Sequence, residues 1–243
     1  SNDICDRFID TMHGFKALVQ AYDPITFKAC ATSAMRQAEN GMGLVGRVKD
    51  ETGINLNIIS GKEEAQIIIA THIDRHLKPK QHCLYVDVGG GSTELTLIKD
   101  KKELASKSFP IGSVRLLEKQ VTKADWAGME EWIVDKTANI KNIQSIGSGG
   151  NINKILTLLL KTKGKSVTIS EIESTIRKIE PYSIHDRVVK LELRLDRADV
   201  IVHAGKIYSR CMQWSGAKEM IVPQVGLPDG IVSQLYSDYK LKN

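Results

Sequence analysis

The residues from 87 to 94 combine two acids, three glycines and two hydroxyls: Asp87, Gly89, Gly90, Gly91, Ser92, Thr93 and Glu94. Because glycine has no side chain, backbone N–H groups at residues 89–91 can converge on an anion, and the two hydroxyls add further donors. The acids at the two ends supply the hard oxygen ligands that hold Mg²⁺ beside a phosphate. The segment therefore predicts a site for phosphate and magnesium.

This glycine loop differs from two common nucleotide motifs. A dinucleotide fingerprint requires a helix directly after the glycines, and a P-loop ends in Gly-Lys-Ser or Gly-Lys-Thr. Here, apolar residues precede the loop at 84–88 and alternate with polar residues after it at 94–98, which predicts a hairpin of two strands. The alternative is an ordinary glycine-rich turn in which Asp87 is a buried structural residue.

A second pair of acids, Glu63 and Glu64, follows Ser60 and precedes a helix with an apolar stripe. Carboxylates in the first turn of a helix complement the positive end of its dipole, so one interpretation is capping. The other interpretation is that one carboxylate points into a cleft and deprotonates a water molecule, as a general base does. The sequence leaves both interpretations open.

Two further segments carry polar groups just after predicted strands. A strand over residues 25–31 leads to Arg36, and the end of a strand is a common place for ligand-binding side chains in α/β proteins. A surface role for Arg36 is the alternative. A short strand over residues 143–146 delivers Gly147, Ser148, Gly149 and Gly150 to the start of a helix. Backbone donors and the helix dipole converge there, which predicts a second anion or nucleotide contact.

The composition restricts the class of protein. The chain has 243 residues, a formal net charge of +5 and 5% aromatic residues. This modest excess favours anionic partners, without the basic patches and aromatic side chains of sequence-specific nucleic-acid binding. Four cysteines are scattered without a paired motif, and no signal peptide or membrane-spanning run is visible, which favours the cytoplasm. The chain begins with Ser1, and we expect that a segment precedes it.

The elements that must position these residues alternate between strands and helices, which predicts an α/β fold. The order strand, hairpin, strand and helix over residues 84–117 is the opening of a ribonuclease-H-like unit. The segment Leu77 to His82, which contains Pro79 and lysines, is the best candidate for a linker. We therefore expect a first lobe over residues 1–80 and a second lobe over residues 81–243.

Several segments, in order along the chain, also resemble a known family: residues 31–36, 59–65, 86–95, 146–150, 197–201 and 226–230. The sequences Ile-Ser-Gly-Lys-Glu-Glu-Ala and Asp-Val-Gly-Gly-Gly-Ser-Thr-Glu-Leu are the most specific. They resemble the exopolyphosphatase/guanosine pentaphosphate phosphohydrolase (Ppx/GppA) family. The resemblance implies an actin-like, sugar-kinase-like fold, in which two ribonuclease-H-like lobes face each other across a cleft. It also implies Mg²⁺-dependent release of terminal orthophosphate from polyphosphate or guanosine pentaphosphate, and a homodimer.

Position by position, the resemblance implies roles for the residues described above. Glu64 resembles the catalytic carboxylate that activates water, and Asp87 and Glu94 resemble the acids that hold the metal. Residues 89–93 resemble a phosphate cradle, and Arg36 resembles an arginine that neutralises phosphate charge. The loop at residues 147–150 would add a further phosphate contact.

This chain departs from the family pattern at two places. The family's other phosphate loop, on the first hairpin of the first lobe, is absent, so we expect a truncated first lobe in a short form without an HD domain. The family's Gly-Leu-Arg-Glu-Gly turn is Gly-Leu-Pro-Asp-Gly at residues 226–230, which loses a basic residue. Two other functions stay open: an ATP-binding kinase-like protein, with residues 147–150 as the adenosine loop, and a polyphosphate or nucleotide sensor without turnover.

Overall fold

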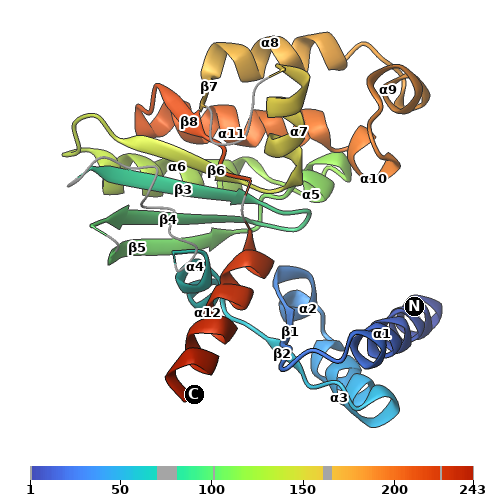
Figure 1. Cartoon of the computed structure of the whole chain (residues 1–243). Helices are drawn as coiled ribbons and strands as arrows, with labels where there is room; N and C mark the ends of the chain where they lie inside the picture. Colours follow the sequence, from blue (N-terminus) through green and yellow to red (C-terminus); the bar gives the residue numbers. More distant parts are fainter. Residues whose placement is uncertain (1, 70–80, 101, 161–165, 225, 243) are drawn as a thin grey trace.

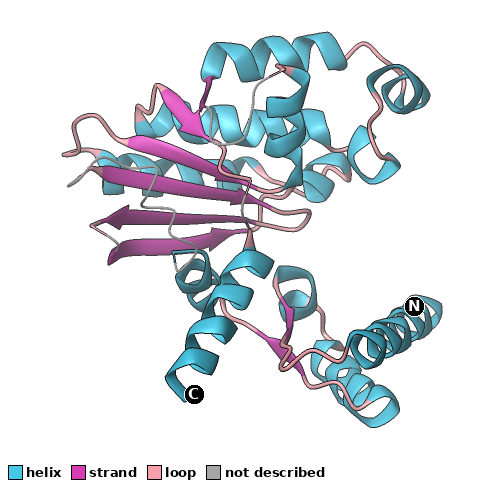
Figure 2. Ribbon diagram, viewed as in Figure 1, coloured by secondary structure: helices cyan, strands magenta, loops and turns pink. Residues whose placement is uncertain are grey.

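The computed structural model describes residues 2–69, 81–100, 102–160, 166–224 and 226–242. Figures 1 and 2 show a larger part built around a six-stranded sheet, and a smaller part in which helices surround a two-stranded sheet. The alternation of helices and strands confirms the predicted α/β class. Within the described residues, no helix is both long and apolar enough to cross a membrane.

The larger sheet has the strand order β5-β4-β3-β6-β8-β7. Strands β3, β4 and β5 form an antiparallel meander, and β6 and β8 continue the sheet in parallel with β3. This is the ribonuclease-H-like arrangement that the sequence predicted. The strands are β3 (His82–Val88), β4 (Thr93–Lys99), β5 (Lys102–Phe109), β6 (Gln144–Ser148), β7 (Ser166–Thr168) and β8 (Glu219–Ile221).

Helix α11 (Ile201–Ser215) is the centre of the helical layer on this sheet, because it contacts β3 and four other helices. Buried residues of β3, β4, α7, α8 and α11 form one continuous apolar core. Figure 1 shows α6, α11 and α8 on the same side of the strands. The other helices of this part are α5 (Ser113–Leu117), α6 (Lys123–Thr137), α7 (Gly150–Leu158), α8 (Ile169–Ile179), α9 (Ile184–Leu191) and α10 (Leu195–Ala198).

The smaller part contains the parallel strands β1 and β2 and a separate small core of Ile9, Met12, Val48, Ile54 and Leu56. Strand β1 is shorter than the strand predicted over residues 25–31, since only residues 29–31 are paired. Short β1 leads directly into α2, which carries Arg36. The elements are α1 (Asn2–Tyr22), β1 (Ala29–Ala31), α2 (Ser33–Gln37), α3 (Gly41–Thr52), β2 (Leu56–Ile58) and α4 (Gly61–Ile69).

The last helix, α12 (Leu227–Lys242), packs against α4 of the smaller part. A side-chain carbon at Gly230 would lie 2.2 Å from the Ile67 carbonyl oxygen, so glycine allows the two helices to touch through their backbones. The expected linker at 77–82 lies largely outside the described residues, and the division into lobes at residue 80 stays a prediction.

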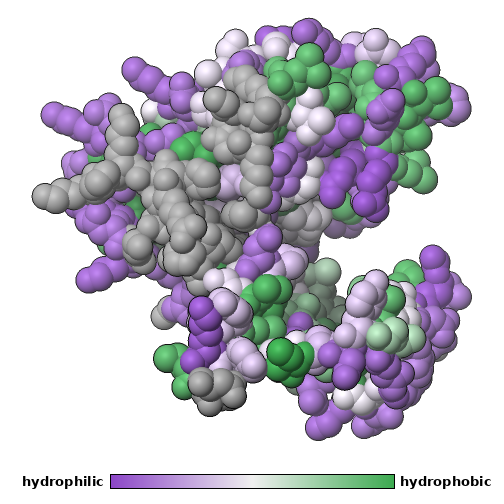
Figure 3. Space-filling view, viewed as in Figure 1, coloured by the Kyte–Doolittle hydropathy of each residue, from purple (hydrophilic) through white to green (hydrophobic). Residues whose placement is uncertain are grey.

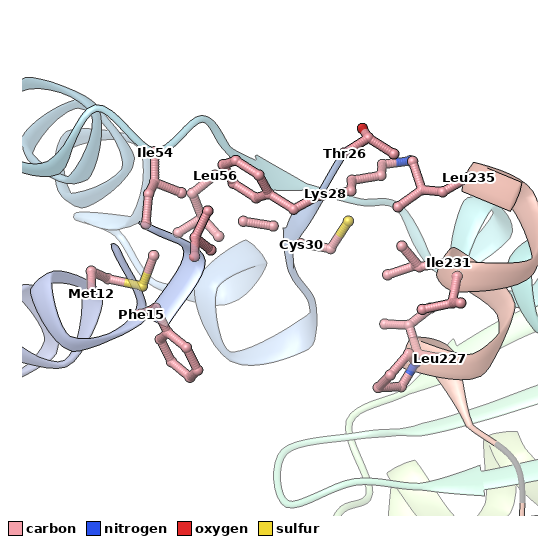
Figure 4. A pocket seen from close by; sticks show the side chains of 15 residues that line it. Met12, Phe15, Thr26, Lys28, Cys30, Ile54, Leu56, Leu227, Ile231 and Leu235 are labelled. Carbon is pink, nitrogen blue, oxygen red and sulfur yellow. The ribbon is translucent and has the colours of Figure 1, made fainter. Parts of the chain in front are cut away.

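On another side, α12 lines an apolar groove of about 490 Å³ together with α1, β1 and β2. Figure 4 shows Leu227, Ile231 and Leu235 of α12 facing Cys30 of β1 across this groove. In the space-filling view, the molecule is indented between its two parts, and hydrophobic side chains gather on the lower part beside α12 (Figure 3).

Candidate active site

The glycine loop connects β3 to β4 in a hairpin, as the sequence predicted. Asp87 and Glu94 lie opposite each other in the antiparallel register. The Gly89 amide donates to the Ser92 carbonyl oxygen at 2.9 Å and closes the turn. No hydrogen bond among the described residues uses the amides of residues 90 and 91, so the bend keeps backbone donors for a ligand.

A pocket of about 190 Å³ lies beside this bend. Its lining comes from both parts of the molecule: Thr32, Ser33, Ala34, Glu64, Asp87, Gly89, Gly90, Gly91, Ser92 and Glu94. Pockets that enclose drug-sized ligands measure roughly 300–1,000 Å³. This smaller pocket therefore matches the size of a terminal phosphoryl group better than that of a whole nucleotide.

Glu63 and Glu64, which are adjacent in sequence, have different surroundings. Glu63 Oε2 accepts hydrogen bonds from the Ser60 amide at 2.8 Å and the Ser60 hydroxyl at 2.9 Å, and the Glu63 amide donates to Ser60 Oγ at 3.1 Å. This reciprocal pattern is a capping box, and it lowers the pKa of Glu63. Glu64 is 7% exposed and lines the pocket, so the capping interpretation applies to its neighbour.

The Glu64 carboxylate lies near the Arg36 guanidinium. Arg36 Nη1 is 3.8 Å from Glu64 Oε2 and donates to the Ile59 carbonyl oxygen at 2.6 Å. Arg36 Nη2 is 3.7 Å from Glu94 Oε1. Glu64 Oε2 makes no hydrogen bond with the described residues. Arg36 therefore lies between the acids of the smaller and larger parts, and an oxygen of Glu64 is left for another partner.

The electrostatic environment raises the pKa of two of these acids, Glu64 and Asp87. Burial is the largest cause that raises the pKa of Glu64 to about 7; Glu94 and Asp87 add to the shift, and Arg36 opposes it. Burial, followed by the charge of Glu94, raises the pKa of Asp87 to about 7 as well. Interacting carboxyl groups titrate as a pair, so protons are exchanged at this site near neutral pH. A base with such a pKa is suited to accept a proton from water.

The hydroxyls of the predicted phosphate loop already have partners. Glu94 Oε1 accepts hydrogen bonds from Ser92 Oγ at 2.6 Å and from Ser108 Oγ at 3.0 Å. Thr93 Oγ1 donates to the Ile111 carbonyl oxygen at 2.6 Å, and Thr93 is fully buried. Thr93 does not line the pocket, so its predicted phosphate contact stays a prediction.

The loop at residues 147–150 lies beside Asp87 but does not line the pocket. Strands β3 and β6 pair so that Ser148 is opposite Asp87. A side-chain carbon at Gly149 would lie 3.4 Å from Asp87 Oδ1 and 3.0 Å from the Tyr208 hydroxyl, and one at Gly150 would overlap the Arg197 guanidinium. Protein atoms thus surround this loop. Its predicted phosphate contact stays a prediction, because the loop does not line the pocket.

The sequence pattern predicted no role for three residues at or near the site: Ser33, Ser108 and Tyr208. Ser33 lines the pocket and lies three residues before Arg36 in α2, a spacing that places both residues on one face of the helix. This spacing is a local signal in the sequence from which Ser33 could have been identified. The Tyr208 hydroxyl donates to the Ser148 carbonyl oxygen. These two residues lie 60 positions apart, and no local pattern connects them.

Asp87 and Glu94 fit a hard divalent cation through the chemistry of their oxygens. The part of the chain that the structure describes has no group of three or more His, Cys, Asp or Glu side chains placed to hold a metal ion. Mg²⁺ commonly binds one or two carboxylates and completes its shell with water and phosphate oxygens. The acids beside this pocket therefore fit Mg²⁺ in company with a phosphate ligand.

The fold and the site define an α/β protein of ribonuclease-H-like topology with an acid-lined pocket between its two parts. A sequence model described as the Ppx/GppA phosphatase family matches residues 1–238. The chain belongs to the Ppx/GppA phosphatase family, which confirms the resemblance carried by the motifs.

Curated relatives match part of the chain. Exopolyphosphatase 1 of Mycobacterium tuberculosis (strain ATCC 25618 / H37Rv) is 31% identical over 111 residues, which cover 46% of this chain and 32% of that protein. The bifunctional 3-dehydroquinate synthase/phosphatase of Fusobacterium nucleatum is 42% identical over 92 residues, or 37% of this chain and 14% of that protein. The matches thus span about a third or less of these relatives.

Solved structures match nearly the whole chain. The Ppx/GppA phosphatase of Aquifex aeolicus has a TM-score of 0.71 at 25% identity, over 96% of this chain and 83% of that one. An exopolyphosphatase of Cytophaga hutchinsonii has a TM-score of 0.81 at 20% identity, over 98% of this chain and 83% of that one, and shares the fold. The predicted fold class is confirmed.

Proposed function

We propose that this protein is a phosphoanhydride hydrolase that releases terminal orthophosphate from polyphosphate with Mg²⁺. The observation that carries the proposal is the position of Glu64: a buried carboxylate with a pKa near 7, across a small pocket from the triple-glycine bend. The names of the matched relatives, several of them exopolyphosphatases, support the same reaction class.

The side chains supply what phosphoanhydride cleavage requires, namely charge neutralisation, positioning and an activated water. Glu64 accepts a proton from the attacking water. The backbone amides at residues 90 and 91 hold the oxygens of the terminal phosphoryl group, and Arg36 neutralises part of its charge. Burial of Glu64 keeps its proton affinity high enough for this task at neutral pH.

Asp87 is the first candidate to hold Mg²⁺, because it lines the pocket next to the bend. Glu94 has one oxygen already engaged with Ser92 and Ser108, so its second oxygen is the one left for the cation or its water. When bound, Mg²⁺ neutralises charge on phosphoryl oxygens.

A comparison of substrates tests the reaction class. The protein is incubated with polyphosphate, guanosine pentaphosphate or ATP, with Mg²⁺ or with excess EDTA, and released orthophosphate is measured. We expect release from polyphosphate that requires Mg²⁺. Preference for guanosine pentaphosphate would assign the alternative substrate within the same reaction class. Turnover of ATP alone would contradict the proposal and favour a kinase-like protein. Polyphosphate binding without any release of orthophosphate would favour a sensor.

The substitution Glu64→Gln tests the proposed base. It removes the proton acceptor while it keeps the shape, so we expect phosphate release to fall by about 10²- to 10⁴-fold with polyphosphate binding largely kept. Glu63→Gln is the matched control, because glutamine can still complete the capping box with Ser60. Equal rates in the two variants would remove Glu64 from the mechanism.

A further inference from the structure

We propose that Ser33, on the smaller part, is the hydroxyl that contacts the bound phosphoryl group. The sequence pattern instead predicted Ser92 and Thr93 of the glycine loop as the hydroxyl donors. The inference rests on the proposed function for the identity of the ligand, and on the count of hydroxyl protons in the pocket for the identity of the donor.

The hydroxyl of Ser92 lies between two oxygens. Ser92 Oγ is 2.6 Å from Glu94 Oε1 and 2.8 Å from Ser33 Oγ. A serine hydroxyl carries one proton and can therefore donate a single hydrogen bond. The shorter contact, with the carboxylate, is the stronger one, because hydrogen bonds to ionised acceptors are shorter and stronger than neutral ones. Ser92 therefore donates its single hydrogen bond to Glu94.

The proton between Ser92 and Ser33 must then come from Ser33. The hydroxyls form a chain with one direction, in which Ser33 donates to Ser92 and Ser92 donates to Glu94. Glu94 Oε1 also accepts from Ser108 and lies 3.7 Å from Arg36, which holds this end of the chain in place. Thr93 donates to the Ile111 carbonyl oxygen on the far side of the strand.

The Ser33 hydroxyl can therefore give up its hydrogen bond to Ser92 at a low cost in free energy. If its hydroxyl rotates toward a ligand, the loss is one hydrogen bond between neutral groups, whereas Ser92 would have to leave a carboxylate. Ser33 also lines the pocket, and its oxygen lies 3.4 Å from the position of a side-chain carbon at Gly91. A phosphoryl group held by the amides of the bend is thus within reach of Ser33.

The consequence concerns how the two parts cooperate. In the free pocket, Ser33 and Ser92 join α2 to the hairpin by a hydrogen bond. With phosphate bound, Ser33 exchanges this neutral acceptor for a charged one, and Arg36 of the same helix lies beside it. Helix α2 thereby supplies both a hydroxyl and a guanidinium to the substrate, and the hairpin supplies backbone amides.

Binding of inorganic phosphate to the full chain, measured by calorimetry, tests this assignment. We expect Ser33→Ala to weaken binding about tenfold, with a similar rise in KM for polyphosphate and a smaller change in kcat. Ser33→Thr keeps the hydroxyl and should bind within about threefold of the wild type. Ser209→Ala is the control: it removes a serine hydroxyl that donates to Glu173 outside the pocket, and binding should not change.

Ser92→Ala distinguishes the two candidate donors. It takes a hydrogen bond from Glu94, so we expect a lower melting temperature and a change in phosphate affinity of less than about threefold. Wild-type affinity in Ser33→Ala together with a tenfold loss in Ser92→Ala would overturn the proposal. Phosphate binding that depends on Ser33 in a protein without turnover would reject the proposed function alone. Absence of phosphate binding by the wild-type protein would reject both.

Discussion

The loop at residues 89–92 and the loop at residues 147–150 leave the adjacent strands β3 and β6, and both lie beside Asp87. In the first loop, side-chain carbons added at the glycines would meet other atoms no closer than 3.1 Å, and each glycine lines the pocket. In the second loop, they would lie 2.5 Å from Met220 Sδ and 1.7 Å from Arg197 Nη1. The first loop borders empty space, and the second is filled by the protein.

The difference shows that a run of glycines can serve either ligand binding or close packing, and that the sequence alone does not distinguish the two. Glycine leaves room for whatever approaches the backbone, and this can be a ligand or another side chain. Gly149 also has φ of +109°, a conformation that other residues adopt at a cost. Substitutions in the first loop should therefore reduce activity, and substitutions in the second should reduce stability.

The largest effect should come from pH, because the first loop faces acids with raised pKa values. Glu64 must be ionised to accept a proton, so phosphate release should fall roughly tenfold per unit as the pH drops below about 7. A pH–rate profile between pH 5 and 9 measures this. A constant rate over that range would show that Glu64 is not the base.

Stability should change in the opposite direction over the same range. The pKa of Glu64 is higher in the folded protein than in the unfolded chain, so the folded state binds more protons between pH 4.5 and about 7. The free energy of unfolding should therefore decrease as the pH rises through this window. Glu64→Gln removes the part of this dependence that comes from Glu64 and leaves the part from Asp87, whose pKa is raised as well. At pH 8 the variant should be more stable than the wild type by about 2 kcal/mol. Urea unfolding without metal at pH 5 and pH 8 makes the comparison.

Gly91→Ala should reduce activity next most strongly. The added methyl group would sit 3.4 Å from Ser33 Oγ, an ordinary contact, so the fold has room for it. It would occupy the space in which a phosphoryl group meets the bend, and we expect phosphate release to fall about 10- to 100-fold. The melting temperature should stay within a few degrees. A large loss of stability instead would mean that this loop is as tightly packed as the other one.

Gly149→Ala should have the opposite profile. The new methyl group would lie 3.0 Å from the Tyr208 hydroxyl and 3.2 Å from the Val88 carbonyl oxygen, at a backbone conformation unfavourable for alanine. We expect a loss of about 1–3 kcal/mol in the free energy of unfolding. Gly46→Ala in α3 is the control, since nothing lies within 4 Å of its added carbon. A variant at residue 149 with full stability and lost activity would assign the second loop to the ligand.

Much of the fold could be predicted from local patterns. Buried β3, the glycine bend and alternating β4 follow one another within 18 residues, so their periodicity and turn chemistry were sufficient. The same alternation separates Ser92 and Glu94 from Thr93, which shares its face of β4 with the buried Leu95. The hydroxyl of Thr93 could therefore have been expected to face away from the pocket.

The acidic pair gives the same lesson. Ser60 and Glu63 have the spacing of a capping box, which would have left Glu64 as the residue free for chemistry. Contacts over long sequence separations had no such signal. The hydrogen bond between Ser33 and Ser92, and the close packing of Gly230 on Ile67, depend on how the two parts meet. These contacts are fixed by tertiary packing, which no local period describes.

Tyr208→Phe should have the smallest effect and gives the finest test of the division between the loops. The Tyr208 hydroxyl donates to the Ser148 carbonyl oxygen beneath the second loop, and Tyr208 is fully buried. The variant removes one hydrogen bond to that oxygen while it keeps the ring, so we expect a loss of about 1 kcal/mol in stability. Tyr236→Phe, at an exposed position on α12, is the control.

Phosphate release should stay within about threefold of the wild type in Tyr208→Phe, because neither the second loop nor Tyr208 lines the pocket. Among the described residues, Asp87 both lines the pocket and lies beside the second loop, so a disturbance there could reach the reaction through this carboxylate. A tenfold decrease in rate at unchanged stability would mean that the second loop orients Asp87. The two loops would then form one reacting unit, and the division drawn from their packing would be wrong.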